Sequence, residues 1–370
     1  MMATNFIFGT DISSYAELKS LGVTYFNAFG EKEALPILLK NAGVRAIRLR
    51  LFVDPYDKDK KPYGGGTNDL ISTLALAKEL KEYGFDLVLD FHYSDFWADP
   101  GKQFLPKAWQ HLSYEGLEER IYTYTMDALT AFIDEGITFT HIQIGNEITN
   151  GLLWPHGKLF EGEEPVPFGY PKLARLLNAG IRAARHVMPM SKLIMHLDRG
   201  GDLTLYETWF KTMVPLLLPF DVIGLSYYPY WHGTLNDLKE NVNNIQQNFN
   251  HSLMIMETSY AFNAEEGSYP FVVNATKTPP TTYPFSPQGQ ERFLLDLYAL
   301  ADTLQLEGVF YWEPAWLLNP PLTWATKAGM NYIKEWHKKE GNEWANQALF
   351  SFDGKALPGL YAYLNYWGKK

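Results

Sequence analysis

Two glutamates stand at the ends of apolar, strand-like runs, and their side chains are the ones best placed to do chemistry. Glu147 follows Asn146 in "HIQIGNEITNGLLWP", and Glu257 closes the run in "LMIMETSYAF". A carboxylate at the end of a buried strand needs a partner or a task, because burying an unpaired charge is costly. Two facing carboxylates are the usual equipment for glycoside hydrolysis, in which one protonates the leaving oxygen and the other attacks the sugar or activates water.

Other polar side chains lie on or end similar runs. Arg48 and Arg50 alternate with apolar residues, so one strand face carries two guanidiniums that need carboxylate partners. Arg48 beside Glu257 would hold that carboxylate ionised, as a nucleophile requires. For Glu313, in "WEPAW", a salt bridge and a role in the site are equally good interpretations. The remaining candidates at strand ends are Asp11, His92, Asp95, Asp198, Tyr227, Tyr228 and Trp312.

Eight short apolar runs predict the strands that would position these side chains. Most are rich in Val, Ile, Leu and Phe, as strands buried on both faces are. The predicted strands are Phe6–Asp11, Ala46–Phe52, Leu87–His92, Phe139–Ile144, Leu193–Leu197, Val222–Tyr227, Leu253–Met256 and Val309–Trp312.

Helical patterns alternate with these strands. Four helices pass into strands through a glycine, which supplies the left-handed conformation that ends a helix. The predicted helices are Leu70–Glu82, Leu117–Glu135, Lys172–Val187, Leu235–Asn248 and Gln288–Gln305, and the glycines are Gly43, Gly84, Gly136 and Gly308.

This alternation, with no linker-like stretch, predicts one α/β domain over residues 1–370, a (β/α)8 TIM barrel. The competing open, doubly wound sheet would need a glycine-rich fingerprint after the first strand, and "FGTDISSYAELKS" has none. In a barrel the active site lies at the carboxyl ends of the strands, so Glu147 and Glu257 would face one cavity.

The composition favours a neutral ligand. The net charge of −10 argues against nucleic acid, and no apolar run is long enough to span a bilayer. The chain has no cysteine, which excludes disulfides and thiolate chemistry. Aromatic residues make up 15% of the chain, and several of its 11 tryptophans lie in loop-like stretches such as "DFWADPGKQ" and "GLLWPHG". Rings on loops around a cleft suit the apolar faces of sugars.

Other chemistries have weaker support. The nine histidines are scattered and no His-Glu-x-x-His occurs, which argues against a metal hydrolase. "GLSYY" lacks the second glycine of a nucleophile elbow, so Ser226 is expected in the barrel interior. The run Gly64-Gly65-Gly66 has no following Gly-Lys-Ser/Thr and is expected to be a loop. Proton abstraction from a small metabolite stays open, although it leaves the loop tryptophans unexplained.

Several longer motifs resemble one family across essentially the whole chain. Asn-Glu after the fourth strand and Glu at the end of the seventh resemble clan A of the glycoside hydrolases. "VRAIRLRLFVDP", "DFHYSDFWADPGKQ", "IQIGNEITNGLLWP", "IGLSYYPYWHGTL", "METSYAF" and "GVFYWEPAW" narrow the resemblance to the endo-β-1,4-galactanases of glycoside hydrolase family 53, which act on galactan and arabinogalactan.

The resemblance implies a role for each matching residue. Glu147 would be the acid/base and Glu257 the nucleophile of a retaining, endo-acting hydrolase. Asn146 would bind the 2-hydroxyl of the sugar, while Arg48 and Tyr228 would support the nucleophile. Trp312 would form the floor of the −1 subsite, and the other positions matching the cleft are Asp11, His92, Asp95, Trp97 and Trp231.

Two departures from the family pattern matter. Bacterial relatives often bind calcium through a loop after the seventh strand, but "AFNAEEGSYPFVVNATKTPPTTYPFSPQGQ" lacks the usual ligands. Glu265 and Glu266 are its candidate ion ligands, and we expect no metal and no required cofactor. Phe52 replaces a tryptophan found in many relatives, which would change the packing below the cleft and leave the chemistry intact.

Two alternative functions remain open. Another clan A activity, such as a mannanase or glucanase, would use the same carboxylate pair. A barrel that binds polysaccharide without cutting it would have replaced one carboxylate, and both are present.

The expected partner is a neutral polysaccharide, with no nucleic acid and no membrane, and the expected state is a monomer. A curved β-1,4-galactan would require a bent, open groove formed by the loops that carry Trp97, Trp109, Trp154, Trp231 and Trp316. "MMATNFIFGTDISS" contains no signal peptide. We therefore expect an extracellular protein whose signal has been removed, with a cytoplasmic protein as the alternative.

Overall fold

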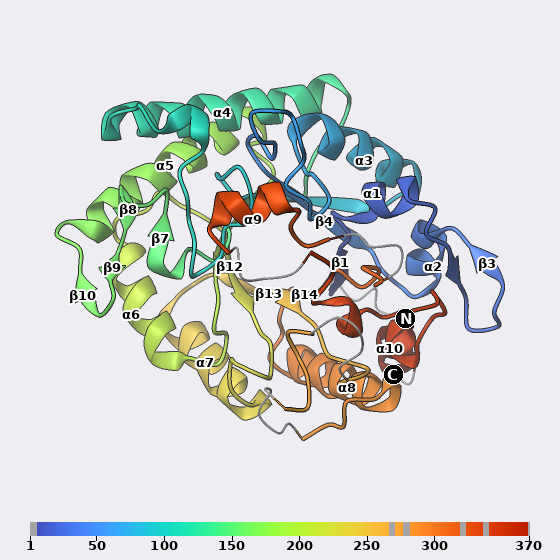
Figure 1. Ribbon diagram of the computed structural model, residues 1–370. Helices are drawn as coiled ribbons and strands as arrows, with labels where there is room; N and C mark the ends of the chain where they lie inside the picture. Colours follow the sequence, from blue (N-terminus) through green and yellow to red (C-terminus); the bar gives the residue numbers. More distant parts are fainter. Residues whose placement is uncertain (1–5, 266–270, 277–281, 319–322, 336–339, 369–370) are drawn as a thin grey trace.

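The computed structural model describes residues 6–265, 271–276, 282–318, 323–335 and 340–368. Its centre is a closed barrel of parallel strands, in the spatial order β1-β14-β13-β12-β11-β6-β5-β4 (Figure 1). The barrel strands are β1 (Ile7–Asp11), β4 (Ala46–Leu51), β5 (Asp86–Phe91), β6 (His141–Ile144), β11 (Lys192–Leu197), β12 (Val222–Ser226), β13 (Ser252–Thr258) and β14 (Gly308–Trp312). The predicted TIM barrel is confirmed, and each predicted strand overlaps one of these.

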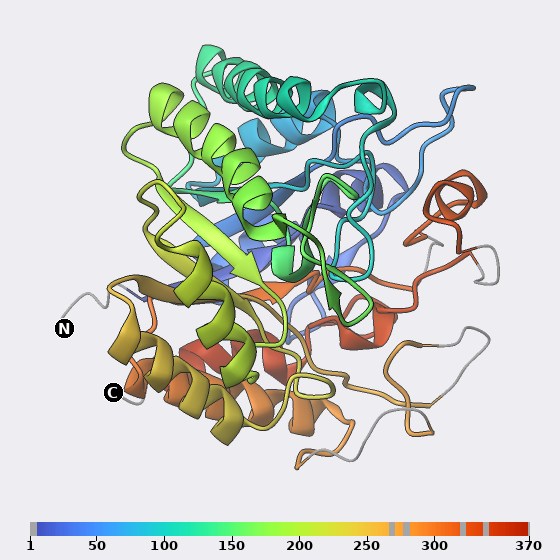
Figure 2. The same ribbon diagram turned by 90° about the vertical axis from the view of Figure 1, so that its left-hand side faces the viewer.

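Helices surround the barrel, and the turned view shows α4 and α5 side by side (Figure 2). The five helices predicted with bounds are present, two of them with the predicted bounds. The helix expected before Gly43 is α2, whereas α1, α6, α9 and α10 were not predicted. The helices are α1 (Tyr15–Ser20), α2 (Leu35–Asn41), α3 (Leu70–Glu82), α4 (Tyr114–Asp134), α5 (Gly169–Val187), α6 (Leu203–Met213), α7 (Leu235–Asn248), α8 (Pro287–Thr303), α9 (Lys327–Ile333) and α10 (Ala362–Trp367). None of the helices in the described ranges is both long and apolar enough to cross a membrane.

Short elements complete the chain, and most lie in the loops between strands and helices. The short strands are β2 (Tyr25–Phe26), β3 (Lys32–Glu33), β7 (Gly151–Leu152), β8 (Gly157–Lys158), β9 (Phe160–Glu161) and β10 (Glu164–Pro165). The 3₁₀ helices are η1 (Lys107–Trp109), η2 (Ile148–Asn150), η3 (Ala345–Gln347) and η4 (Pro358–Tyr361).

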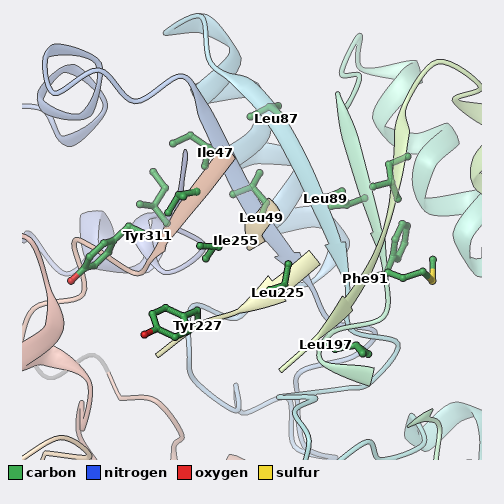
Figure 3. Packing of buried hydrophobic residues seen from close by; sticks show 14 of the residues in the cluster. Ile47, Leu49, Leu87, Leu89, Phe91, Leu197, Leu225, Tyr227, Ile255 and Tyr311 are labelled. Atoms are coloured by element: carbon green, nitrogen blue, oxygen red, sulfur yellow. The ribbon is translucent and has the colours of Figure 1, made fainter. Parts of the chain in front are cut away.

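The barrel strands bury both faces, each in a different environment. On β4, Ile47 and Leu49 belong to the large hydrophobic cluster packed between the barrel and the helices. Figure 3 shows them with three other members of this cluster, Leu87, Leu225 and Ile255. The alternate side chains point into the barrel, where an apolar plug fills one part of the interior. The plug consists of Ala46, Val88, Ile194, Val222, Met254, Met256 and Phe310. Arg48 and Arg50 continue the inward face of β4 above this plug.

Three of the four predicted glycine turns are confirmed and one is wrong. Gly43, Gly84 and Gly136 have φ of 89°, 75° and 71°, in the left-handed region. After α8 that conformation belongs instead to Gln305, with φ of 54°. Gly308 is the first residue of β14, where a Cβ would lie 2.5 Å from the Ile7 carbonyl oxygen. Its glycine therefore permits close approach of β1 and β14 rather than a turn.

The carboxyl ends of the barrel strands depart from regular geometry where the candidate site residues lie. Left-handed φ values occur at Tyr93, Glu147, Arg199 and Glu313, each shortly after a barrel strand. On β13 the register against its two neighbouring strands is irregular near Glu257. Non-glycine residues in this conformation and register shifts re-aim side chains and cluster at functional sites.

Candidate active site

The two glutamates predicted to do chemistry lie at the same end of the barrel, as expected. Glu147 follows β6 with φ of 47°, so its side chain leaves the alternation of that strand. Glu257 follows Met256, whose side chain is part of the interior plug, and the register shift on β13 turns Glu257 toward the cavity as well. Both side chains are nearly buried, with residue exposures of 9% and 7%.

Arg48 is the central cation of this end of the barrel, and its side chain is fully buried. One terminal nitrogen, Nη1, lies 2.8 Å from Glu257 Oε1 and 3.2 Å from Asp11 Oδ2. The other, Nη2, lies 2.8 Å from Asp90 Oδ2 and donates a hydrogen bond of 2.9 Å to Asn146 Oδ1. Burial alone would lower the pKa of Arg48, but the three surrounding carboxylates raise it, so the guanidinium stays charged.

The contacts that the family resemblance implied around Glu257 are present. Arg48 pairs with one carboxylate oxygen, and the Tyr228 hydroxyl donates to the other, Oε2, at 3.0 Å. Asn146 is fixed by its side-chain amide, which donates to the Ala98 carbonyl oxygen at 2.9 Å. The nucleophile candidate is therefore held from two sides.

The environments of the two carboxyls separate their pKa values. Burial and the charges of Glu257 and Asp198 raise the pKa of Glu147 well above its ordinary value, and a hydrogen bond from Ser226 acts in the opposite direction. Burial also raises the pKa of Glu257, but the charge of Arg48 lowers it. Glu147 is thus the member of the pair that keeps a proton, and Glu257 is the one that ionises. This difference supports Glu147 as the candidate acid and Glu257 as the candidate nucleophile.

A cavity of about 250 Å³ opens at these two carboxyls. Its walls combine a few charged groups with a large aromatic surface, the combination expected of a sugar-binding cleft. The lining consists of Arg50, His92, Trp97, Ala98, Asp99, Lys102, Asn146, Glu147, Tyr228, Glu257, Val272, Trp312, Trp316, Trp324, Glu343 and Trp344.

Most of the predicted substrate-binding residues are in this lining, and four are not. His92, Trp97, Asn146, Tyr228 and Trp312 line the cavity. Those that lie outside the lining are Asp11, Arg48, Asp95 and Trp231.

Two of these four act through other residues. Asp11 is fully buried and pairs with Arg48 and Arg50, at 3.2 and 3.0 Å. Asp95 is also fully buried, and its oxygens accept from the backbone N–H groups of Asp54 at 3.1 Å and Lys107 at 2.7 Å. Both carboxylates therefore hold other residues around the cleft in place.

Of the other two, Arg48 contacts Glu257 as described above, and Trp231 is 44% exposed. The Trp231 ring packs near Tyr228 and Trp344, whose ring centroids lie 5.9 and 6.0 Å away. It extends the aromatic surface beyond the cavity.

The expectation for the loop tryptophans needs a correction at Trp109. That ring is buried at 3% exposure in the core, against Tyr124 at 5.5 Å, because η1 folds back onto α4. Trp154 is half-buried and its indole donates to the Asn150 carbonyl oxygen at 2.9 Å, outside the cavity lining. Trp97 and Trp316 do line the cavity. Phe52 packs against His92 and Trp97 at the base of the cleft, where the sequence placed it.

Five charged and aromatic lining residues were not predicted. Asp99 and Lys102 form an ion pair of 2.5 Å within a motif that the sequence analysis quoted, so that motif was the available signal. Trp324, Glu343 and Trp344 come from the segment after the last barrel strand, where no strand-end pattern marks them. Trp344 meets Trp312 edge-to-face, with ring centroids 5.0 Å apart and 66° between the ring planes.

Of the two interpretations of Glu313, a salt bridge or a role in the site, the structure supports the salt bridge. Its Oε1 lies 2.7 Å from Arg50 Nη1 and accepts from the Ser14 backbone N–H at 3.1 Å. Burial raises its pKa to about 7 although Arg50 opposes the shift. The Arg50 guanidinium in turn lies 4.6 Å from the Trp97 ring and 5.7 Å from the Trp312 ring. Glu313 therefore supports the cation beneath the aromatic platform.

Calcium ligands were not expected in the loop after β13. Glu265 is exposed, and Glu266 lies outside the described residues. Across the described ranges, no group of three or more His, Asp or Glu side chains is arranged to hold a metal ion. We assign no step to a metal.

Comparison with known proteins places this arrangement in context. Residues 7–363 match a family model described as Glycosyl hydrolase family 53. The chain is 35% identical over 381 residues to the endo-beta-1,4-galactanase of Bacillus subtilis (strain 168), with 98% of this chain and 86% of the relative covered. It is also 35% identical over 323 residues to the arabinogalactan endo-beta-1,4-galactanase A of Aspergillus niger, with 85% and 86% covered. The solved Ignisphaera aggregans GH53 catalytic domain superposes with a TM-score of 0.88 at 36% identity, covering 98% of this chain and 96% of that one.

Proposed function

This chain belongs to glycosyl hydrolase family 53, and from that membership we propose that it is an endo-β-1,4-galactanase. It cleaves internal β-1,4-galactosidic bonds of galactan and type I arabinogalactan and retains the anomeric configuration. The observation that carries the proposal is the buried carboxyl pair, Glu147 and Glu257, at the floor of an aromatic cavity. Its galactanase relatives supply the substrate class.

In the first half-reaction Glu257 attacks the anomeric carbon of the sugar while Glu147 protonates the leaving oxygen. Arg48 and Tyr228 keep the attacking carboxylate ionised and oriented, through contacts of 2.8 and 3.0 Å. The bond from carbon to the leaving oxygen breaks as the bond to a Glu257 oxygen forms, and the proton of Glu147 leaves with the departing chain.

In the second half-reaction water replaces the departed chain. The charge of Glu257 has been consumed in the ester bond, so one of the charges that raised the pKa of Glu147 is gone. Glu147 then accepts a proton from water, which attacks the same anomeric carbon and releases Glu257. Two inversions give net retention.

The aromatic lining explains how a neutral chain is held. Trp312, Trp97 and Trp344 offer ring faces, whereas Asn146 and His92 offer polar atoms next to the carboxyls. In this proposal Asn146 binds the 2-hydroxyl of the sugar under attack, and the contacts of its amide with Arg48 and Ala98 hold it in one orientation.

The decisive experiment is incubation with linear β-1,4-galactan, followed by product analysis over time. Short galacto-oligosaccharides should appear from the wild type and be absent with Glu147→Gln and Glu257→Gln. Parallel incubations with mannan and cellulose oligomers test the other clan A activities. A non-cutting polysaccharide binder would give no products from any of the three, which would refute the proposal.

Two further properties are part of the proposal. We expect a monomer, which sedimentation at micromolar concentration measures. We also expect the protein to act outside the cell, since its polymeric substrate does not cross a membrane. Cell fractionation of the native source checks this expectation, and confinement to the cytoplasm would contradict it.

A further inference from the structure

We propose that Gln103 is a positioning residue for the acid/base, because it holds the backbone of Glu147 in the conformation that directs the carboxyl into the cavity. Gln103 lies in the loop between β5 and η1 and is 1% exposed. It is not among the residues that line the cavity, so its side chain acts through other residues. The inference deepens the proposed function and rests on Glu147 being the acid/base.

The backbone of Glu147 needs support from outside its own segment. Its φ and ψ are 47° and 53°, in the left-handed region that a residue with a side chain rarely adopts. Such a conformation costs free energy and persists where the surrounding contacts determine it. A change of φ at Glu147 would rotate its side chain about the N–Cα bond. The contacts that fix this backbone therefore also fix the direction of the carboxyl.

The peptide unit that joins Asn146 to Glu147 is held at both of its polar atoms. Its carbonyl oxygen accepts a hydrogen bond of 2.8 Å from Gln103 Nε2. Its N–H donates to His196 Nδ1 at 3.4 Å. The two partners come from different parts of the barrel, the loop after β5 and strand β11. Because the unit is planar, holding both atoms restricts rotation about the bonds on either side of it, one of which is the φ bond of Glu147.

The neighbours of the Gln103 amide determine its orientation. Nε2 lies 2.8 Å from the Asn146 carbonyl oxygen, 3.3 Å from that of Asp99 and 3.5 Å from that of Glu147. Carbonyl oxygens only accept, so the amide nitrogen must face them. The opposite orientation would place the amide oxygen against three acceptors. Gln103 is thus the donor in this contact, and a side chain without an N–H or O–H could not replace it.

Gln103 also holds the far end of the loop that begins with Glu147. Its own carbonyl oxygen accepts from the Trp154 backbone N–H at 2.8 Å. The residues between these two contacts include a second left-handed residue, Leu153, with φ of 50°. One residue of the loop after β5 therefore fixes the loop after β6 at both ends.

The test compares two substrates that differ in their need for the acid. Galactan requires a proton from Glu147 on the leaving oxygen, whereas 2,4-dinitrophenyl β-galactobioside releases a stable dinitrophenolate anion without one. Gln103→Met keeps the length of the side chain and removes the donor. It should lower kcat/KM on galactan by about 10- to 100-fold, the size expected when a catalytic group is misplaced. On the aryl substrate, kcat/KM should stay close to that of the wild type.

The water step gives a second readout in the same variant. Hydrolysis of the glycosyl-enzyme needs Glu147 as the base, so kcat on the aryl substrate should fall even though kcat/KM does not. Azide needs no base, and it should raise this kcat by displacing Glu257 from the anomeric carbon. The product should be a β-galactobiosyl azide of retained configuration. A loss caused by general damage to the fold would not respond to azide.

Gln103→Glu tests the donor itself at nearly constant shape. A protonated carboxyl at this position can donate to the Asn146 carbonyl oxygen, whereas a carboxylate faces three acceptors and can donate to none of them. The ratio of its kcat/KM on galactan to that of the wild type should therefore rise as pH falls. The same ratio for Gln103→Met should lack this rise.

Gln290→Met is the matched control. Gln290 is fully buried on α8, and its amide also donates to two backbone carbonyl oxygens, those of Tyr260 at 2.7 Å and Ala348 at 2.9 Å. Neither oxygen belongs to the loop that begins with Glu147. The variant should therefore lose stability and keep the wild-type ratio of kcat/KM on the two substrates.

Equal losses of kcat/KM on galactan and on the aryl substrate in Gln103→Met would overturn the proposal, because they would show general damage. Wild-type activity of that variant on galactan, or a ratio for Gln103→Glu that does not change with pH, would overturn it by showing that the donor is not needed. Failure of the wild type to cut galactan would refute the proposed function before any variant is compared, so the two ideas fail separately.

Discussion

Glu147 and Glu257 are chemically identical side chains that the barrel places in different surroundings. A buried cation at 2.8 Å supports ionisation of Glu257, whereas Glu147 faces the charges of Glu257 and Asp198. The difference arises from one residue of β4, since Arg48 reaches Glu257 and not Glu147. The proposed roles of acid and nucleophile therefore follow from neighbours rather than from residue type.

Loss of either carboxyl should nearly abolish turnover. We expect Glu147→Gln and Glu257→Gln each to reduce kcat by about 10⁴-fold, at the upper end of what acid–base groups contribute. Circular dichroism should show an intact fold, because an amide fills the same space. Azide should partly restore turnover of a Glu257→Ala variant and yield a glycosyl azide of inverted configuration. Near-wild-type activity in either glutamine variant would contradict the assignment.

The two raised pKa values predict the pH dependence of activity. Glu257 must be ionised to attack, so activity is lost as pH falls through its raised pKa. Glu147 must be protonated to act as acid, so activity is lost as pH rises through its more strongly raised pKa. We expect a bell-shaped kcat/KM profile whose limbs both lie above the ordinary glutamate pKa. An acid limb at or below that ordinary value would be inconsistent with the burial of Glu257.

At the scale of elements, the sequence predicted the barrel strands because a strand buried on both faces is a short apolar run. It also predicted the carboxyls that end such runs. The inward-facing Asp90 and Gln143 escaped notice, since each stands inside an apolar run and ends none. Helix α2 was expected only from Gly43 at its end and without bounds, because its seven residues are too few for a periodic pattern. Trp324 and Trp344 were missed because they reach the cavity from beyond the last strand.

Helix α1 is joined to the site by a pH-sensitive contact. Glu17 Oε2 accepts the Gly66 backbone N–H at 2.9 Å, and the adjacent Gly65 carbonyl oxygen accepts from Arg50 at 3.0 Å. Burial raises the pKa of Glu17 to about 7. Between the ordinary pKa of a glutamate and about pH 7, Glu17 is therefore protonated in the folded protein and ionised in the unfolded chain. Stability contributed by Glu17 is therefore lost as pH rises through that window.

Glu17→Gln should consequently flatten the pH dependence of stability. We expect the drop in Tm from about pH 5 to about pH 7.5 to be smaller in the variant than in the wild type, since the amide stays neutral in both states. Exposed Glu82→Gln, on α3, is the matched control and should leave the drop unchanged. An identical drop in Glu17→Gln and the wild type would show that the contact does not titrate as proposed.

The whole barrel divides its interior into an apolar plug and a charged layer. Met254 belongs to the plug and is fully buried, whereas Arg48 and Asp11 lie in the layer that faces the cavity. This division assigns stability to one part of the interior and chemistry to the other, as parallel barrels generally do.

A cavity in the plug should therefore reduce stability more than activity. Met254→Ala should lower the free energy of unfolding by about 2–5 kcal/mol, the usual range for such a truncation. Met254→Leu should cost less than about 1.5 kcal/mol, because it conserves volume. Denaturant titration measures both, and kcat measured well below the transition should stay near the wild-type value. A large loss of kcat with little loss of stability would place Met254 in the active layer instead.

Substrate choice depends on the shape of the whole cleft. A β-1,4-galactan chain is curved because the 4-hydroxyl of galactose is axial. In the cleft, the rings of Trp97, Trp312 and Trp344 form a tilted rather than a flat surface. The interplanar angle is 55° between Trp97 and Trp312 and 66° between Trp312 and Trp344. Glucose would leave polar groups that face an axial hydroxyl unpaired, a mismatch that discriminates strongly. We therefore expect cleavage of galactan and not of cellulose or mannan. The cleavage should be internal, so viscosity falls before much reducing sugar appears. Comparable kcat/KM on cello-oligosaccharides, or galactose as the sole early product, would contradict this expectation.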